Sequence, residues 1–565
     1  MNRAWNGPAA IAAGLLIALL AGAWLMYETR GTTLWFDEWL WALQYRDGLH
    51  TFIAPHNGHP TLVPFTIYRL LFATFGIDHS APYRVVGIAG HLLVVALLYV
   101  YSARRAGAAI GFLAAGSILL LGPGWQNIIW PLQIGWPISI ACGLGALLAL
   151  DRRDRKGDVV ACVLLVICVS SSGPGVAIAA GLIVEVLRGR GWRSAWIVAV
   201  PLALFAIWYL AYQDSGSVRS ELSLAPGFAA DSAAATFSAI AGLAGPLIGD
   251  EPATLGWGRP LAVVALALLL WRLWRLGTVS TRVLTLLAIL AAFWFLTAIQ
   301  RAGIGPAESS RYVAVAAVFV VALIVELLGG VVISRTAWLV IGTAAVLIAL
   351  ANVGDMRTGA QFLRDQSLTT RTGLAAAEIA RPVVRPDEPI TGIAGYPLVV
   401  VPAGKYFQLE RDLGTPAASA AELAAAPEGA RRGADDELTK FHRVGLTPTT
   451  PSPGQGAAPT VDAFIGGRAT PSGGCVEFAP AGAGPAVPDP AIELTVPASG
   501  LVLTARGGGA GVSYRRFADR YPDDPHDRLA PGGSGLLTIR PDRSPRPWHV
   551  RVAPEARLTA CAAPS

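Results

Sequence analysis

Residues 9–27 read AAIAAGLLIALLAGAWLMY, a run of nineteen residues without a charge. At about 1.5 Å per residue, a helix of this length is roughly 28 Å long, which is enough to cross the hydrocarbon core of a bilayer. A cleaved signal peptide is the alternative, because Arg3 precedes the apolar run. The length of the run, and the lack of a small-residue cleavage site before Glu28, favour a membrane span.

Ten further apolar runs precede residue 355, at 84–103, 107–122, 132–150, 159–172, 174–187, 196–212, 260–276, 282–300, 312–330 and 338–354. Two of them flank the sequence SSSGPG at Ser170–Gly175. They are either two short helices that meet there or one broken helix, because Gly-Pro-Gly cannot continue a regular helix. Residues 1–354 are therefore predicted to form an α-helical polytopic membrane body with about eleven transmembrane helices.

The composition agrees with a membrane protein. Of the 565 residues, 53% are hydrophobic and 15% are charged, whereas soluble proteins carry about 25% charged residues. The mean hydropathy is +0.50. These values exclude an ordinary cytosolic enzyme.

The net charge of +6 does not indicate nucleic-acid binding, because the basic residues gather in short loops beside apolar runs. These loops contain Arg104–Arg105, 152–156, 188–193, 272–282 and Arg335. By the positive-inside rule they are cytoplasmic, and so is the N-terminus. Loops 28–83 and 213–259, and everything after Asp355, are then extracytoplasmic. The expected location is the plasma (inner) membrane.

The region after residue 354 differs in composition, since it holds 25 of the 40 prolines and no long apolar run. Residues 355–445 are predicted to mix helix and strand, with an apolar stretch at Leu398–Val401. Residues 446–460 form a Pro/Gly/Thr-rich linker. Residues 461–565 alternate apolar and polar positions, as in Ile492/Leu494/Val496 and Trp548/Val550/Val552, which predicts a β-sandwich. This domain either binds glycan, positions an acceptor or is a cap without a ligand.

The cysteines fall into two groups. Cys142, Cys162 and Cys168 lie in apolar runs and are expected to be small buried residues. Cys475 and Cys561 are the only two after residue 354. An oxidising compartment permits them to pair, so a disulfide between them is predicted.

Two short polar motifs follow the first apolar run. In Leu34–Trp41 (LWFDEWLW), the adjacent acids Asp37 and Glu38 lie among four aromatic residues. They are either a functional pair or the water-facing acids of an interfacial helix. In Pro55–Pro60 (PHNGHP), His56 and His59 are either exposed in a turn or serve phosphate binding or proton transfer. A divalent metal is a weaker alternative, because H-x-x-H in a loop is weak evidence, and no cofactor is assigned.

The sequence resembles the GT-C superfamily of membrane glycosyltransferases that use polyprenyl-phosphate sugars. Phe36-Asp37-Glu38 with Trp41 is similar to a pattern of the protein O-mannosyltransferases. The lipid A aminoarabinose transferase is another member that it looks like. A second similarity is Ser310-Arg311-Tyr312, because many members carry an Arg-Tyr pair near the lipid phosphate.

The resemblance implies roles for individual residues. Asp37 would be the catalytic base, and Glu38 would orient the acceptor or hold a cation. Arg311 and Tyr312 would bind the donor phosphate, with Arg301 as a second cation and His56 and His59 as further candidates.

The segment 122–136 (GPGWQNIIWPLQIGW) adds candidates for contacts with sugar hydroxyl groups, namely Gln126, Asn127 and Gln133. Its tryptophans, Trp125, Trp130 and Trp136, offer stacking faces, although membrane-interface anchoring is the favoured interpretation.

These observations favour an inverting membrane glycosyltransferase at the outer face of the membrane. Its partners would be the bilayer, a polyprenyl-phosphate-linked sugar donor and a glycan, lipid or protein acceptor. Two alternatives stay open: a lipid or polysaccharide transporter or flippase, and a non-catalytic scaffold for envelope assembly.

Overall fold

The computed structural model describes residues 8–212, 221–248, 255–450, 457–481 and 489–564. The chain divides into two compact units. The first comprises Met1–Thr32, Gln44–Phe75 and His79–Asp365, and the second comprises Thr33–Leu43, Gly76–Asp78 and Gln366–Ser565. Parts of the predicted loop 213–259, of the linker and of the C-terminal domain (213–220, 249–254, 451–456 and 482–488) lie outside the described residues.

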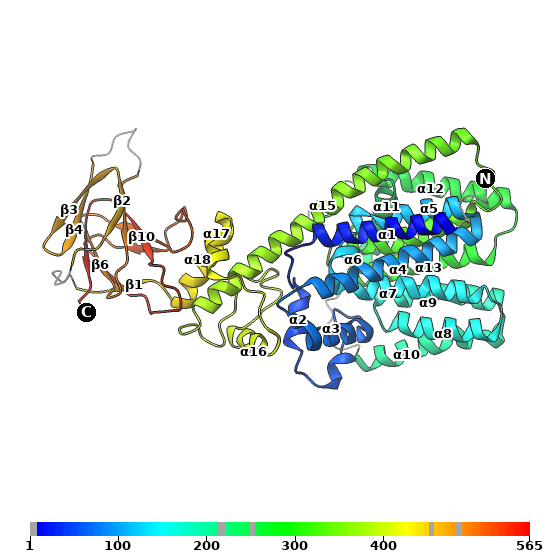
Figure 1. Ribbon diagram of the computed structural model, residues 1–565, viewed down its shortest axis with the longest axis horizontal. Helices are drawn as coiled ribbons and strands as arrows, with labels where there is room; N and C mark the ends of the chain where they lie inside the picture. Colours follow the sequence, from blue (N-terminus) through cyan, green and yellow to red (C-terminus); the bar gives the residue numbers. More distant parts are fainter. Residues whose placement is uncertain (1–7, 213–220, 249–254, 451–456, 482–488, 565) are drawn as a thin grey trace. The chain divides into compact units, whose positions relative to one another are not determined.

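The first unit is helical (Figure 1). Its elements are α1 (Pro8–Glu28), η1 (Leu49–Phe52), α3 (Leu62–Phe75), α4 (Ala81–Ala106), α5 (Ala108–Leu119), η2 (Gly122–Gly124), α6 (Trp125–Ile129), η3 (Pro131–Ile134), α7 (Gly135–Leu150), α8 (Arg155–Val169), α9 (Gly173–Gly189), η4 (Trp192–Ser194), α10 (Trp196–Tyr212), η5 (Leu222–Leu224), α11 (Ala225–Ile240), α12 (Leu255–Leu276), α13 (Thr281–Arg301), α14 (Ser310–Leu327) and the first part of α15 (Arg335–Ile379).

Six helices within the described residues are long and apolar enough to cross a membrane. A seventh span is possible if α5 and Gly122–Ile129, which are bent by 56°, count as one. The chain is therefore a multi-pass membrane protein. Each of the eleven runs singled out in the sequence coincides with a helix, but α8, α9 and α10 have only 15 to 17 residues. The sequence-predicted loops 28–83 and 213–259 also contain helices, α3 and α11.

The SSSGPG motif separates two helices. α8 ends at Val169, α9 begins at Gly173, and the two helices lie side by side (Figure 1). A Cβ atom at Gly175 would lie only 2.1 Å from the carbonyl oxygen of Cys168, so this close approach requires glycine.

The core of the first unit lies around α7 and α14. Both helices are apolar on all sides and are buried along most of their length, as expected for a helix surrounded by other helices. The packing of α9 on α13 depends on Gly181, where a Cβ atom would lie 2.3 Å from Ile289. These helices form the frame that holds the site described below.

An ionic cluster joins the ends of five helices in this unit. Arg105 of α4 contacts Asp151, which follows α7, at 2.8 Å and Glu326 of α14 at 2.7 Å. Arg282 of α13 contacts Asp151 and Glu185 of α9, both at 2.9 Å. Because all five side chains are at most one-quarter exposed, their mutual pairing offsets the cost of removing them from water.

The second unit begins with helices. They are α2 (Asp37–Leu43), the end of α15, α16 (Ala403–Leu413), α17 (Ala420–Ala425) and α18 (Glu428–His442). Residues 355–445 are all described, and they form helices but no strand, including at the apolar Leu398–Val401; an isolated bridge joins Pro389 and Pro402. Prolines at 397 and 402 lack the N–H group that a strand ladder needs.

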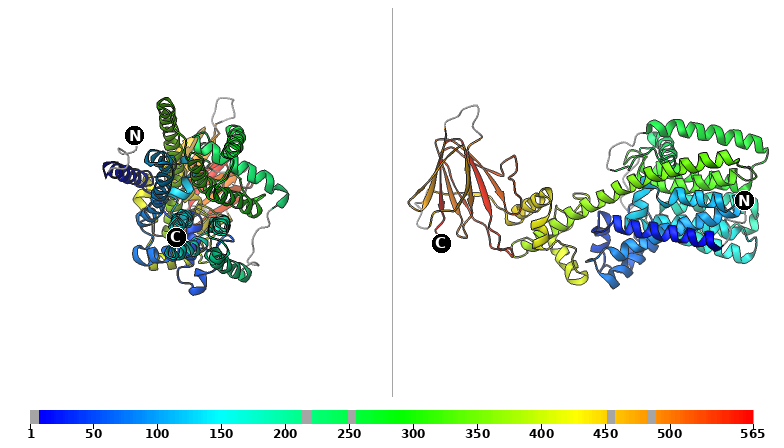
Figure 2. Two further views of the ribbon diagram at one scale, coloured as in Figure 1. Left: turned by 90° about the vertical axis from the view of Figure 1, so that its right-hand side faces the viewer. Right: turned by 45° about the horizontal axis from the view of Figure 1, so that its top comes forward.

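The rest of this unit is formed by strands (Figure 2). They are β1 (Leu446–Pro448), β2 (Val461–Ile465), β3 (Gly467–Ser472), β4 (Cys475–Pro480), β5 (Ala491–Thr495), β6 (Leu501–Arg506), β7 (Ala510–Arg515), β8 (Asp527–Leu529), β9 (Ser534–Leu537), β10 (His549–Pro554) and β11 (Arg557–Ala562). One antiparallel sheet has the order β1-β9-β6-β11-β4-β3 and the other β2-β5-β10-β7-β8.

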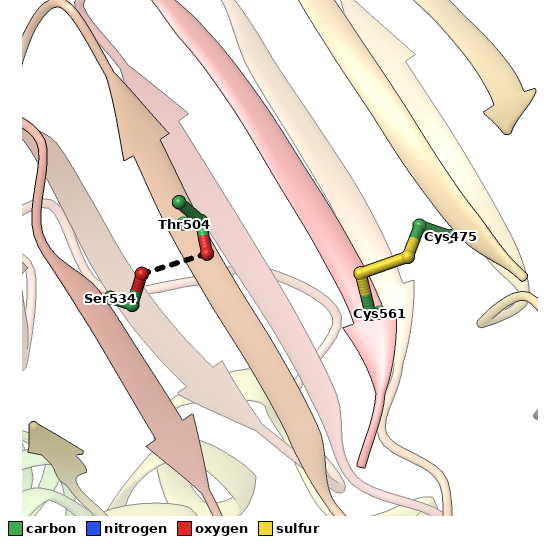
Figure 3. The surroundings of a disulfide bond; sticks show 4 residues. All are labelled: Cys475, Thr504, Ser534 and Cys561. Atoms are coloured by element: carbon green, nitrogen blue, oxygen red, sulfur yellow. Dashed lines mark hydrogen bonds between the residues drawn. A yellow bond between two sulfur atoms is a disulfide. The ribbon is translucent and has the colours of Figure 1, made fainter. Parts of the chain in front are cut away.

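A disulfide joins Cys475 of β4 to Cys561 of β11, which are directly opposite each other in the sheet (Figure 3). In the same sheet, the hydroxyl groups of Thr504 and Ser534 are hydrogen bonded at 2.9 Å.

Buried acids attach α18 to the strands. The Asp435 carboxylate accepts hydrogen bonds from the backbone N–H groups of residues 516–518. Asp542 pairs with both His442 and Arg516. Helical and strand parts therefore belong to one folded unit.

Candidate functional site

The His56–His59 motif forms a tight turn. The backbone N–H of each histidine donates to the carbonyl oxygen of the other at 3.0 Å. The two central residues, Asn57 and Gly58, have φ angles of 51° and 78°. Positive φ at both central positions is the signature of a type I′ turn, for which Asn-Gly is the preferred sequence. The turn therefore follows from the local sequence.

Arg301, the last residue of α13, binds this turn. Its Nη2 donates to the carbonyl oxygen of Asn57 and to Nε2 of His59, both at 3.0 Å. Because guanidinium groups only donate, Nε2 of His59 must be the unprotonated nitrogen. The ring is also close to α9, where a Cβ atom at Gly173 would lie 2.8 Å from Nδ1 of His59.

Burial and nearby positive charge keep His59 neutral. Burial lowers the pKa of His59 to about 3, with smaller contributions from the charges of Arg301, His56 and Arg311. Two arginines from different helices, α13 and α14, therefore act on the same imidazole. Such a concentration of positive charge favours an anion.

A cavity of about 250 Å³ opens beside these residues. Its lining is Gly58, His59, Pro60, Trp136, Gly173, Pro174, Val176, Ala177, Phe205, Tyr209, Phe293, Leu296, Thr297, Ile299, Gln300, Arg301 and Tyr312. None of these described lining residues carries a carboxylate. The first turn of α9 contributes Gly173 and Pro174, and a helix N-terminus is favourable for anions.

The cavity changes in polarity along α13. This helix contributes Phe293, Leu296, Thr297, Ile299, Gln300 and Arg301 to the lining. Arg301 lies eight positions after Phe293, so the lining passes from apolar to cationic over about 12 Å. The lining therefore combines an apolar stretch with a cationic end, a combination that suits the binding of an amphiphile with an anionic group.

Tyr312 and Trp136 form an aromatic part of this lining. Their ring centroids are 6.1 Å apart, and Tyr312 is buried. Arg311 is half-buried, and its Nε donates to the hydroxyl group of Ser309 at 3.3 Å.

The segment 122–136 contributes less directly to the cavity. Asn127 is buried and donates from Nδ2 to the carbonyl oxygen of Arg311 at 2.8 Å. The backbone N–H of Gln126 donates to the hydroxyl of Ser310 at 3.1 Å. Gln133 is buried within η3. None of these three residues lines the 250 Å³ cavity; Trp136 is the residue of this segment that does.

Asp37 and Glu38 belong to the second unit, where they begin α2. Both are buried. The Glu38 carboxylate accepts the backbone N–H of Trp35 at 2.8 Å, and Phe36 between them has a positive φ of 52°. Glu38 thus closes the turn that presents Asp37. Within the same unit, Phe36 contacts Gly395, because a Cβ atom there would lie 2.5 Å from the ring.

The structure thus brings together His59, Arg301 and Tyr312, with Arg311 nearby, and places Asp37 and Glu38 in the other unit. Sequence analysis missed Thr297, Gln300, Phe205 and Tyr209, since residues of an apolar run carry no local signal of a cavity. Among the described residues there is no group of three or more His, Cys, Asp or Glu side chains that could hold a metal ion.

Comparisons with known proteins find similar solved structures but no matching family model or curated sequence. No family model matches the chain, and no curated protein sequence does. Among solved structures, the chain is similar to the crystal structure of ArnT from Cupriavidus metallidurans bound to undecaprenyl phosphate, at 12% identity and a TM-score of 0.42, over 67% of this chain and 81% of that chain. It is also similar to the apo structure of that ArnT, at 14% identity and a TM-score of 0.39, over 67% of this chain and 82% of that chain.

Proposed function

We propose that this protein is a GT-C-type membrane glycosyltransferase that transfers a sugar from a polyprenyl-phosphate donor to an acceptor hydroxyl group. The observation that carries the proposal is the cavity of the first unit, which combines Arg301 and His59 with an apolar lining. A polyprenyl-phosphate sugar has the matching chemistry, because its phosphate is anionic and its tail is apolar.

In this proposal the positive charges act on the leaving group. The bond between the anomeric carbon and the phosphate oxygen breaks, and the phosphate leaves with the electron pair. Arg301 and Arg311 stabilise the charge that develops on that oxygen, which is how fixed cations lower the barrier of such a transfer. Tyr312, His56 and His59 complete the phosphate-binding group.

Asp37 is proposed as the general base. It takes the proton of the acceptor hydroxyl, whose oxygen then forms the new bond to the anomeric carbon with inversion. Glu38, which holds the turn before α2, keeps Asp37 in position. Of the three polar residues of segment 122–136, Gln126 and Gln133 remain candidates for contacts with the sugar or the acceptor, and another role is argued for Asn127 below.

The proposal includes a topology. The N-terminus is cytoplasmic, about eleven helices span the inner membrane, and the second unit, ending in a β-sandwich, is extracytoplasmic. The basic loops support this orientation by the positive-inside rule. The disulfide is compatible with it, because extracytoplasmic compartments are oxidising.

The test is a transfer assay with purified full-length protein in vesicles, a panel of polyprenyl-phosphate sugars and mass spectrometry of the acceptors. We expect transfer from at least one donor, and loss of most transfer in Arg301→Ala. Arg259→Ala is the matched control, because that exposed arginine pairs only with Asp231 among the contacts described for it. Movement of labelled lipid between leaflets without any transfer would instead support the flippase alternative.

A further inference from the structure

The amide of Asn127 holds the backbone of Arg311. Its Nδ2 donates to the Arg311 carbonyl oxygen at 2.8 Å. A second contact lies one residue earlier on both segments, where the N–H of Gln126 donates to the hydroxyl of Ser310 at 3.1 Å. Two successive residues of α6 are therefore hydrogen bonded to the first two residues of α14.

Both contacts involve buried side chains. Asn127 and Ser310 are 4% and 1% exposed. The segment that carries Asn127 is itself fixed at two points: the N–H of Gly122 donates to the Asn352 side chain at 3.0 Å, and the Trp125 indole N–H donates to the Pro246 carbonyl oxygen at 2.8 Å. This segment thus has anchoring contacts outside α14 as well.

Asn127 does not reach the proposed donor cavity. It lines a separate cavity of about 20 Å³ together with His91, and this cavity shares no lining residue with the 250 Å³ cavity. Arg311 does not line the 250 Å³ cavity either, but its charge acts on His59, which does. The hydrogen bond from Asn127 to the Arg311 carbonyl oxygen therefore connects Asn127 to the donor cavity through Arg311.

We infer that Asn127 is a positioning residue that sets the orientation of Arg311 toward the donor phosphate, rather than a residue that contacts a sugar. This inference rests on the proposed function. The geometry of a bidentate guanidinium–phosphate contact is demanding, so a shift of the Arg311 backbone would weaken the contact while the helix stays folded.

A double-mutant cycle tests the inference through binding of a short-chain polyprenyl phosphate to purified full-length protein in detergent. Asn127→Ala should weaken binding about tenfold, the scale of one buried hydrogen bond. In the Arg311→Ala background the same change should weaken binding less than about twofold, because residues that act as one unit are not additive. Equal weakening in both backgrounds, or none with Arg311 present, would overturn the inference.

A second measurement does not depend on the donor. Phenylglyoxal modification, mapped by mass spectrometry, reports how accessible each arginine is. In Asn127→Ala, Arg311 should be modified several-fold faster, with Arg301 unchanged. If the rate at Arg311 is unchanged, the inference is wrong even if binding changes. If the rate rises while Arg311→Ala leaves binding intact, Asn127 orients Arg311 but not toward the donor phosphate, which overturns both the inference and the place of Arg311 in the proposed phosphate site.

Two further variants distinguish the loss of this contact from a general disturbance of the fold. Ser310→Ala removes the other contact by deleting a single oxygen atom and should accelerate Arg311 modification in the same direction. Ser238→Ala, at an equally buried serine of α11, is the matched control and should change neither measurement. Elution profile and melting temperature establish that each variant is folded.

Discussion

Arg301 donates a hydrogen bond to Nε2 of His59 across 242 positions of sequence, at a distance of 3.0 Å. The contact fixes the imidazole as a neutral acceptor and leaves its proton on Nδ1. In return, the imidazole and the carbonyl oxygen of Asn57 hold the guanidinium at the edge of the cavity. The histidine therefore orients the cation and does not supply charge of its own.

The first prediction is a pH dependence of stability. The pKa of His59 is lowered to about 3 in the folded protein, below the ordinary value of about 6.5. Between these values the unfolded chain binds the extra proton, so the stability contributed by neutral His59 is complete above pH 6.5 and is lost as the pH falls toward 3. The melting temperature should fall less from pH 7 to pH 4.5 in His59→Gln than in the wild type. An equal fall in both proteins would contradict the assignment.

The second prediction concerns the space beside His59. A methyl group at Gly173 would lie 2.8 Å from Nδ1 of the ring, which is closer than van der Waals contact allows. Gly173→Ala should displace the imidazole, release Arg301 and weaken polyprenyl-phosphate binding by about tenfold, the loss of one charge-assisted hydrogen bond. Gly189→Ala is the control in the same helix, since its nearest contact would be an ordinary 3.9 Å. Equal binding by the two variants would show that the ring does not need this space.

Local sequence predicted part of this site. Apolar runs indicate the helices, because a helix that crosses a bilayer needs apolar side chains. Asn57-Gly58 indicates the turn, because both residues tolerate positive φ. The partnership of His59 with Arg301 has no local signal, since it depends on how α13 packs against the rest of the unit. The same holds for Thr297 and Gln300, which become cavity residues only through the register of α13.

The third prediction concerns the ionic cluster at the helix ends. Arg282 pairs with both Asp151 and Glu185, and its side chain is 10% exposed. Arg282→Met removes the positive charge that pairs with two partly buried carboxylates. This loss should destabilise the protein by about 3 kcal/mol. Arg259→Met, which breaks an exposed pair with Asp231, should destabilise the protein much less, because water screens exposed ion pairs. Unfolding midpoints in detergent measure both, and similar midpoints would mean that the cluster adds no stability.

The last prediction compares the effects of substituting Asp37, the proposed general base, and its neighbour Glu38. Asp37→Asn keeps the size of the side chain but removes its ability to take a proton, so transfer should fall by roughly 10²–10⁴-fold. Donor binding should stay unchanged, whereas Arg311→Ala should weaken it. Glu38→Gln retains an oxygen that can accept the Trp35 N–H, so the turn before α2 survives and the loss of transfer should be smaller than in Asp37→Asn. In a flippase or a scaffold, these three substitutions would not separate into effects on transfer and effects on donor binding. Wild-type turnover by Asp37→Asn in a donor-saturated assay would remove Asp37 from the mechanism.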